Sequence, residues 1–254
     1  MIDIHCHILP GMDNGPQTMK ETLAMAKKAE KQGIHTIIAT PHYHDGIFYN
    51  EKDAIVGAAD YVNAKLHEQQ VKVTILPGQV IRIYADLVRD LERGKLLPLN
   101  ESTGYVLLEL PPDFTPAFVS KLVFDIQIAG YKPILANPEE NKGLRDNSHL
   151  LYELVKNGAL AQTSARSVMG AAGRRTEKWV LQLLDANLAH FVASNAYNGK
   201  MRGIRLRQAY KTVGRQLGTS TVELLKENSA LLAHGEPIIR DAPQRLSNRK
   251  HFFS

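Results

Sequence analysis

Short apolar segments recur along the chain, and each is followed by a polar cluster and then by a segment with helical periodicity. The apolar segments are rich in Val, Ile and Leu, which is typical of strands that are buried on both faces of a sheet. We therefore predict seven strands, within residues 1–7, 35–44, 71–80, 104–112, 132–140, 159–165 and 189–198.

The segments between these strands carry helix signals. In the first of them, Thr18 and Glu21 have the spacing of a capping box, and Gly33 is placed to end the helix. Apolar residues in between fall on one face, as in an amphipathic helix. Similar patterns predict helices over residues 52–69, 84–94, 115–130, 147–157, 172–187 and 203–217.

Alternation of strands and helices implies a parallel sheet with right-handed crossovers. Seven such units predict an α/β fold, a distorted seven-stranded (β/α)7 TIM-like barrel, with an open doubly wound sheet as the alternative. No linker rich in Gly, Ser or Pro interrupts the pattern. We therefore predict a single domain over residues 1–254, in which 219–254 form a C-terminal helix and an irregular basic tail.

Composition narrows the class of protein. Hydrophobic residues make up 44% of the 254 residues, enough for a sizeable core. No apolar run approaches the roughly 18 residues that a membrane-spanning helix needs, and the N-terminus lacks the pattern of a signal peptide. The one cysteine, Cys6, excludes an internal disulfide. We therefore expect a cytoplasmic protein without a transmembrane segment.

The formal net charge is +5, and part of it lies in the tail, at Arg240, Arg245, Arg249 and Lys250. Such a tail is either a solvated terminus or a contact for an acidic partner or membrane surface. Basic and aromatic residues do not alternate along a stripe, so we expect no nucleic acid partner.

Polar side chains gather at the predicted C-terminal ends of the strands, where barrels of this type carry their reactive groups. His5 and His7 alternate on the first strand and can therefore enter one space. His42 and Glu109 end two further strands, and Asp13 follows the first. Imidazoles and carboxylates are good ligands for zinc, manganese or iron. A hydrogen-bonded core histidine and a structural salt bridge of Glu109 are the alternatives.

The motifs at the predicted strand ends resemble those of a known family. MIDIHCHILPGMDNG, IIATPHYHDG, LPGQ, LLELP, NPE and SNAYN are similar in order and spacing to the PHP-type (polymerase and histidinol phosphatase) hydrolases, above all to bacterial tyrosine-protein phosphatases of capsule and exopolysaccharide operons. The resemblance covers essentially the whole chain. It implies a PHP-type barrel, three divalent metals, commonly manganese, and hydrolysis of phosphotyrosine on bacterial tyrosine kinases.

The resemblance also implies roles for single residues. It places His5 and His7 on one metal, His42 on another and Glu109 in the cluster. Several positions where the family carries a metal ligand hold other residues here: Asn14, Val80, Asn137, Asn195 and Tyr197.

Each of these replacements weakens a cation site. An Asn in place of Asp removes the negative charge, a Val in place of Glu leaves an apolar wall, and a phenol with a pKa near ~10 is a poor ligand. Glu140 stands where the family has an arginine for the phosphate, whereas the second expected arginine, Arg202, is present. The sequence leaves open whether Asp13 acts in place of Asn14.

We therefore predict a phosphatase scaffold with weak or absent activity that holds one weakly bound ion or none. The predicted ligands are His5, His7 and Glu109, with Asn195 beside them and His42 apart from its expected partners. Two interpretations of the substitutions are open. The active site has been rebuilt, naturally or by engineering, or the protein is a paralogue that has lost the activity of the family.

Other classes of function remain open as well. A metal-free pocket, engineered as a hydrolase or ligand binder, would be shaped by Val80, Ala165, Arg166 and Tyr197. Its nucleophile would be Ser164 or Ser167, its base His7 or His42 and its orienting group Glu140. The last alternative is a non-catalytic interaction protein that recognises a kinase tail through Arg202 and the basic C-terminus.

Overall fold

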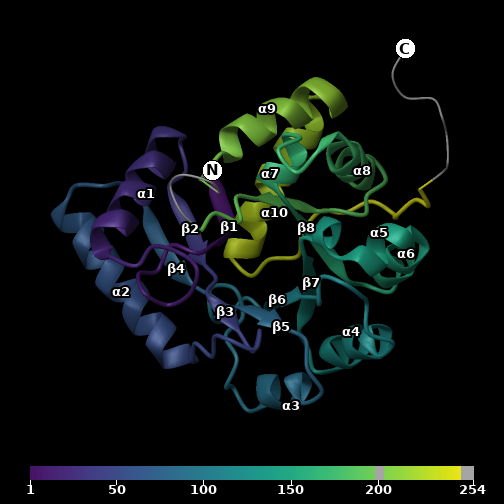
Figure 1. Cartoon of the computed structure of the whole chain (residues 1–254), viewed down its shortest axis with the longest axis horizontal. Helices are drawn as coiled ribbons and strands as arrows, with labels where there is room; N and C mark the ends of the chain where they lie inside the picture. The colour runs from purple at the N-terminus through teal and green to yellow at the C-terminus, as the bar shows by residue number, and fades with distance from the viewer. Residues whose placement is uncertain (198–202, 247–254) are drawn as a thin grey trace.

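The computed structural model describes residues 1–197 and 203–246, and its strands form two parallel sheets (Figure 1). One sheet has the order β1-β2-β4 and comprises β1 (Ile2–Cys6), β2 (Thr36–Ala39) and β4 (Thr74–Pro77). The other comprises, in spatial order, β3 (His42–Tyr43), β5 (Val80–Arg82), β6 (Tyr105–Glu109), β7 (Lys132–Ala136), β8 (Leu160–Ser164) and β9 (Phe191–Ala193). The prediction of an α/β fold with parallel strands is confirmed.

Two of the predicted strands are each divided into two in the structure. Thr40 and Pro41 separate β2 from β3, and Gly78 and Gln79 separate β4 from β5. Pro41 has no N–H to give to a ladder. The buried Gln79 side chain bonds outside the sheet, to the backbone of Asn50 and Leu97. The pairs β2·β4 and β3·β5 therefore lie in different sheets, and the described residues contain nine short strands rather than the seven expected.

The two sheets do not form a single closed barrel. The chain after β9 approaches β1 through hydrogen bonds from Asn195 N to His5 O and from His7 N to Ala196 O, each 2.9 Å long. Asp3 Oδ1 accepts a 2.8 Å hydrogen bond from Ser194 N, where a ladder would use a backbone carbonyl. One isolated bridge, from Cys6 to Ala196, joins the two edges in the described part of the chain. The edges thus meet without a continuous ladder.

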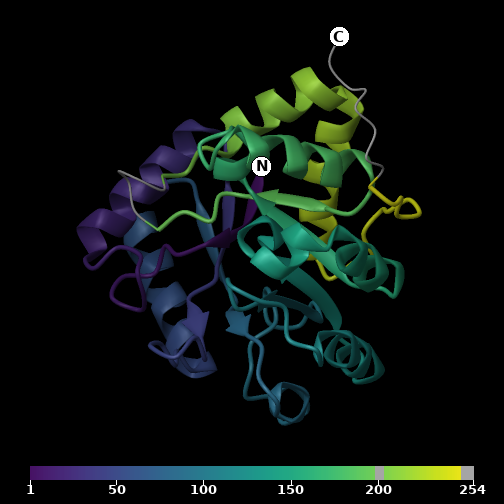
Figure 2. The same ribbon diagram turned by 45° about the vertical axis from the view of Figure 1, so that its right-hand side comes forward.

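Helices surround the strands (Figures 1 and 2), with α2 against β4, α4 against β7, and α10 against β1 and β9. The capping box of Thr18 and Glu21 is present at the first of them. Their bounds are α1 (Met19–Lys31), α2 (Lys52–Glu68), α3 (Leu87–Glu92), α4 (Val119–Ile128), α5 (Lys142–Asp146), α6 (Ser148–Lys156), α7 (Ala165–Val168), α8 (Arg174–Asp185), α9 (Leu206–Leu217) and α10 (Thr219–Ala233), with a 3-10 turn at Pro138–Glu140.

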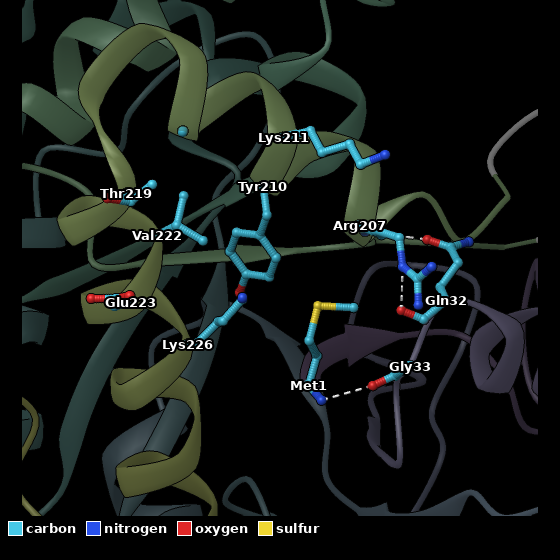
Figure 3. Close-up of a pocket in the computed structure, with 11 residues that line it drawn as sticks. Met1, Gln32, Gly33, Arg207, Tyr210, Lys211, Thr219, Val222, Glu223 and Lys226 are labelled. Carbon is cyan, nitrogen blue, oxygen red and sulfur yellow. Dashed lines mark hydrogen bonds between the residues drawn. The ribbon is translucent and has the colours of Figure 1, made fainter.

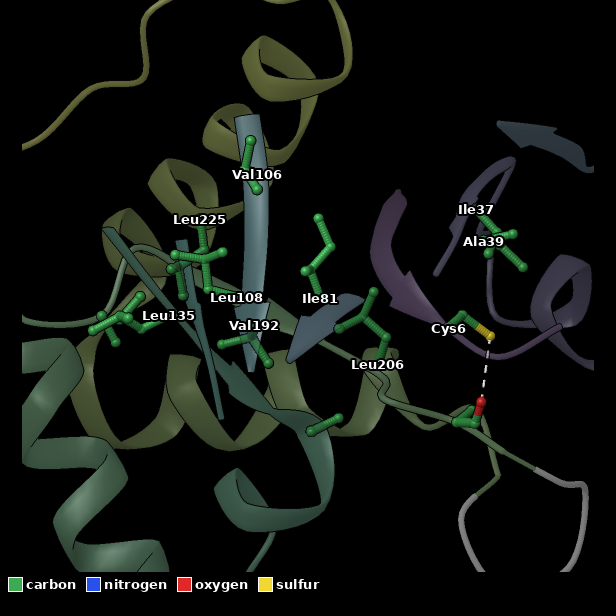
Figure 4. Packing of buried hydrophobic residues seen from close by; sticks show 14 of the residues in the cluster. Cys6, Ile37, Ala39, Ile81, Val106, Leu108, Leu135, Val192, Leu206 and Leu225 are labelled. Carbon is green, nitrogen blue, oxygen red and sulfur yellow. Dashed lines mark hydrogen bonds between the residues drawn. The ribbon is translucent and has the colours of Figure 1, made fainter. Parts of the chain in front are cut away.

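The core has two layers because both faces of the strands are covered. A larger cluster of buried side chains lies between strands and helices, and a smaller one is formed mainly by the opposite strand faces. Figure 4 shows members of the larger cluster: Cys6, Ile37, Ala39, Ile81, Val106, Leu108, Leu135, Val192, Leu206 and Leu225. The packed strands hold their C-terminal ends, and the polar residues there, in fixed positions.

After α10 the chain has neither helix nor strand up to residue 246. Arg240 and Arg245 of the predicted basic tail lie in this segment, whereas Arg249 and Lys250 fall outside the described residues. Among the residues that are described, no helix is both long and apolar enough to cross a membrane.

Candidate metal centre

Five polar side chains from distant parts of the sequence meet at the C-terminal ends of the strands. His5 lies on β1 and His7 just beyond it, His42 begins β3, Glu109 ends β6, and Asp13 comes from the loop after β1. The three imidazoles lie close together, with ring centroids 5.4 Å apart for His5 and His7 and 4.6 Å apart for His7 and His42. Both histidines of the first strand and His42 are buried. The structure thus brings together the candidates that the sequence placed at separate strand ends.

Asp13 organises one side of this group. Its Oδ2 lies 2.5 Å from His7 Nδ1 and accepts a 3.2 Å hydrogen bond from His42 N, while Oδ1 accepts one from Gly15 N. A side chain at Gly15 would meet His7 O at 2.4 Å, so the loop can close only with glycine there. Burial opposes ionisation of Asp13, but the contact with His7 outweighs it and lowers the pKa of the carboxyl. His7 therefore donates from Nδ1 and keeps Nε2 for the site.

Glu109 is engaged by cationic groups of the protein. Its Oε2 lies 3.0 Å from Arg82 Nη2 and 3.4 Å from His42 Nδ1, the latter an ion-pair distance without hydrogen-bond geometry. Burial raises the pKa of Glu109, but His42 and Arg82 together lower it to about 2. Burial likewise opposes protonation of His42, and Glu109 outweighs it, so that the pKa of His42 is raised. The guanidinium of Arg82 thus neutralises a carboxylate that the resemblance assigned to the metals.

Asn137 supports His5 through an intermediate residue. His5 Nδ1 lies 2.7 Å from Gln162 Oε1, and Gln162 Nε2 donates to Asn137 Oδ1 at 3.2 Å. Asn137 itself has a positive φ of 46°, a conformation that asparagine adopts more readily than most residues. Burial and the neighbouring His7 lower the pKa of His5 to about 3, so this imidazole is neutral.

Tyr197 covers the group from the side of β9. Its ring is stacked on that of His7, with centroids 4.2 Å apart and planes 19° apart, and lies 6.2 Å from that of His42. Asn195, two residues earlier, is buried, and its Oδ1 has no hydrogen-bond partner. Val80 is also buried, pairs with His42 in the ladder and belongs to the smaller core cluster. These three residues fill space with neutral or apolar atoms.

Three of these residues form a group that can hold a metal ion. Ligand atoms of His7, Asp13 and His42 all lie within 4.8 Å of one another. His5 Nε2 and His7 Nε2 are buried without a hydrogen-bond partner, which costs free energy unless something binds them. His42 Nδ1 has no hydrogen bond either, only its 3.4 Å ion-pair contact with Glu109 Oε2. This grouping differs from the predicted ligands His5, His7 and Glu109. His42 N donates to the Asp13 carboxylate, and Glu109 Oε2 lies close to both Arg82 and His42.

The remaining candidate residues are exposed or half-buried, have a structural role, or fall outside the described residues. Asn14 and Glu140 are exposed, and Arg166 is half-buried on α7. The Ser164 hydroxyl caps α7, accepting from Ser167 N at 3.2 Å and donating to Ser167 Oγ at 2.9 Å, so it is not poised as a nucleophile against an imidazole. Arg202 lies outside the described residues.

Sequence reasoning missed Glu139, Gln162 and Arg82. Glu139 is buried, its Oε1 accepts a 2.8 Å hydrogen bond from Ser164 N, and its Oε2 has no partner. Burial raises the pKa of Glu139 to about 7. The signal for Glu139 was a polar residue just after an apolar strand, similar to the one that identified Glu109, and the signal for Gln162 was a polar residue within the strand β8.

A cavity of about 520 Å³ lies away from these residues (Figure 3), between α9, α10 and the start of the chain. It shares no residue with the histidine group, and its cations include Arg207, Lys211 and Lys226. Arg207 is held in place by a 2.8 Å hydrogen bond from its Nε to Gln32 O.

Comparison with known proteins identifies close relatives. The family described as capsular polysaccharide synthesis, CpsB/CapC, matches residues 1–233. The tyrosine-protein phosphatase YwqE of Bacillus subtilis is 42% identical over 252 residues, 99% of each chain. The tyrosine-protein phosphatase CpsB of Streptococcus agalactiae is 26% identical over 235 residues, 90% of this chain and 96% of that protein.

A solved structure agrees with the sequence comparison. It comes from a study of YwqE from Bacillus subtilis and CpsB from Streptococcus pneumoniae, described there as unique metal-dependent tyrosine phosphatases. It superimposes with a TM-score of 0.94 at 42% identity and covers 98% of this chain and 100% of that one.

Proposed function

The chain belongs to the CpsB/CapC family of capsular polysaccharide synthesis, and on that premise we propose that it is a metal-dependent protein-tyrosine phosphatase of reduced activity. The observation that carries the proposal is the buried group of His7, Asp13 and His42, whose ligand atoms converge within 4.8 Å. We propose that this group holds one divalent cation, manganese, zinc or iron, in place of a three-metal cluster.

Each residue of the site has a separate role in this proposal. When bound, the cation supplies a Lewis acid that stabilises charge developing on phosphoryl oxygens. Asp13 holds the proton of His7 on Nδ1 and so aims the lone pair of Nε2 into the site. Gln162 does the same for His5. Arg82 keeps Glu109 ionised at the rim of the site.

Reduced activity follows from what surrounds this group. Asn137, Asn195 and Tyr197 offer neutral oxygens where the family resemblance implies imidazole or carboxylate ligands. Fewer anionic ligands hold dications less tightly, and a single cation neutralises less of the charge that develops on the phosphoryl group. Glu140, exposed beside the buried Glu139, adds negative charge near an incoming phosphate dianion.

We further propose the setting of the reaction. The substrate is a phosphotyrosine protein, such as a bacterial tyrosine kinase of capsule or exopolysaccharide synthesis. Cys6 is free and buried, which fits a reducing compartment, so we place the protein in the cytoplasm. We also propose that residues 1–254 form one domain, and that the nine short strands act as a seven-stranded barrel interrupted at Pro41 and Gly78.

Hydrolysis of a phosphotyrosine peptide in the presence of manganese tests the proposal, with the Bacillus subtilis relative YwqE as reference. We expect kcat/KM at least about a hundredfold lower than for YwqE, or about 2.7 kcal/mol of lost transition-state stabilisation. His7→Ala should remove the remaining activity. A kcat/KM within about tenfold of YwqE, or full activity in His7→Ala, would contradict the proposal.

A further inference from the structure

A second polar cavity, of about 360 Å³, lies between α5 and α8. Its lining includes four cationic side chains, one carboxylate and the only tryptophan of the chain. These residues are Lys142, Arg145, Arg175, Lys178, Asp146 and Trp179, and we call this cavity the α5–α8 groove. Four positive charges against one negative charge leave the groove strongly cationic, which attracts anionic groups.

Two of the four cations are available to a ligand. Lys142 pairs with Asp146, and Arg145 donates from Nη1 to Glu139 O at 2.7 Å. Arg175 and Lys178 are exposed, and within residues 1–197 and 203–246 neither has a hydrogen-bond or ion-pair partner. Asp146 lies within the electrostatic range of Arg175 but is paired with Lys142. A ligand carrying carboxylate or phosphate oxygens would pair with Arg175 and Lys178.

The start of α8 adds to this positive field. Arg175 and Lys178 lie in its first turns, and its N-cap residue, Gly173, supplies no side chain to accept hydrogen bonds from the first backbone N–H groups. The N-terminus of this twelve-residue helix carries a partial positive charge, which Glu177 in its first turn offsets in part. Trp179 is half-buried beside them and provides apolar area for the rest of a bound segment.

The groove adjoins the histidine site through one short loop. Arg145 at the groove donates to the backbone of Glu139, and the Glu139 carboxylate accepts from Ser164 N. Asn137, at the start of the same loop, is hydrogen-bonded to the glutamine that orients His5. The loop of Asn137 and Glu139 therefore connects the groove to the residues that orient the histidine group.

We propose that the α5–α8 groove binds acidic residues, carboxylate or phosphorylated, that flank the phosphotyrosine of the substrate. This inference rests on the proposed function for the identity of the reacting residue. Binding in the groove itself requires neither metal nor hydrolysis. The two proposals can thus fail separately.

Intrinsic fluorescence gives a direct test, because Trp179 is the only tryptophan. The metal-free protein, kept in chelator, is titrated with three peptides of equal length: one rich in Glu without tyrosine, one carrying two phosphotyrosines, and one in which Gln replaces Glu. We expect the first two to change the emission and to bind more weakly as salt is raised, and the Gln peptide not to bind. Binding of both anionic peptides identifies charge as the requirement, whereas binding of the phosphopeptide alone identifies phosphate.

Two matched double variants each remove two positive charges, one from the α5–α8 groove and the other from the cavity of Figure 3. Arg175→Gln with Lys178→Gln should weaken binding of the anionic peptides at least about tenfold, or about 1.4 kcal/mol. Lys211→Gln with Lys226→Gln, in the cavity of Figure 3, should leave it unchanged. In turnover of acid-flanked phosphotyrosine peptides, the groove variant should raise KM without changing kcat.

Equal binding by both double variants, or equal binding of the Gln peptide, would overturn the proposal. Peptide binding that depends on Arg175 and Lys178 without any hydrolysis would leave the groove assigned and the phosphatase proposal refuted. Hydrolysis without peptide binding that depends on Arg175 and Lys178 would support the phosphatase proposal and refute the groove proposal.

Discussion

The phenol ring of Tyr197 lies parallel to the imidazole of His7, with centroids 4.2 Å apart and planes 19° apart. His7 is one of the three members of the candidate cation site, and its Nε2 is buried without a partner. An aromatic ring therefore covers the side of the site where the family resemblance implies a further imidazole ligand. This contact keeps the site packed at position 197.

Replacement of Tyr197 by histidine should restore a ligand. We expect Tyr197→His to tighten manganese binding at least about tenfold and to raise phosphatase activity, because a neutral imidazole is a far better ligand than a protonated phenol. Tyr197→Phe is the control, since it keeps the stacked ring, and it should bind manganese as the wild type does. Calorimetric titration with manganese measures both. Unchanged affinity in Tyr197→His would show that position 197 is not beside the cation.

Asp13→Asn should weaken metal binding while the fold persists. The amide keeps the shape and can still accept from Gly15 N, but it lacks the charge that fixes the proton of His7 on Nδ1. Loss of such a carboxylate partner typically costs about 10-fold to 100-fold in metal affinity. Asn14→Asp adds a carboxylate at the neighbouring exposed position and should change affinity much less. If Asn14→Asp had the larger effect, residue 14 rather than Asp13 would face the cation.

Ser164→Ala separates a structural from a nucleophilic role. The hydroxyl accepts from Ser167 N at the start of α7, and loss of such a cap costs about 1 kcal/mol of stability. We expect denaturant unfolding to show this loss, while hydrolysis per folded molecule is retained and a fluorophosphonate labels neither variant nor wild type. Labelling of Ser164 in the wild type would instead support a metal-free serine hydrolase.

His190 should make stability depend on pH. Burial, with a smaller contribution from Arg240, lowers the pKa of His190 to about 4 from an ordinary 6.5. Between these values the unfolded chain binds a proton that the folded chain does not, so the free energy of unfolding falls as pH decreases from about 6.5 to 4. The full loss is on the order of 3 kcal/mol at 1.36 kcal/mol per pKa unit.

Urea unfolding at pH 7 and at pH 4.5 measures this loss for His190. His190→Gln should reduce it, because the Gln carbonyl can accept from Ala161 N as Nδ1 does and takes up no proton. His67→Gln, at an exposed position, should keep the wild-type dependence. If His190→Gln lost as much unfolding free energy between pH 7 and pH 4.5 as the wild type, His190 would not be the cause of the loss.

Much of the fold was predictable because its signals are local. The Thr18 capping box and the apolar runs of β6, β7 and β8 are visible in the sequence and were placed to within a few residues. The division of two predicted strands was missed, although Pro41 marks one break. Which sheet each half joins depends on the side chain of Gln79 and on packing around Gly78, where a Cβ would meet Ile38 at 2.9 Å.

The candidate site was predicted in part. The sequence identified His5, His7, His42, Asp13 and Glu109, since each stands at or just after a predicted strand end. Their grouping was not predictable, because it depends on contacts between distant residues. Asp13 reaches the backbone of His42, and Gln162 reaches His5 across 157 positions. Likewise, pairing of Glu109 with Arg82 appears only when β5 lies beside β6.

We expect the histidine group to bind one divalent cation at most. Elemental analysis of the protein, purified with manganese, zinc and iron available and then dialysed, measures the number of ions per chain directly. We expect about one ion or fewer, lost on dialysis against a chelator and reduced further in His7→Ala. Three ions per chain that survive dialysis would contradict the account.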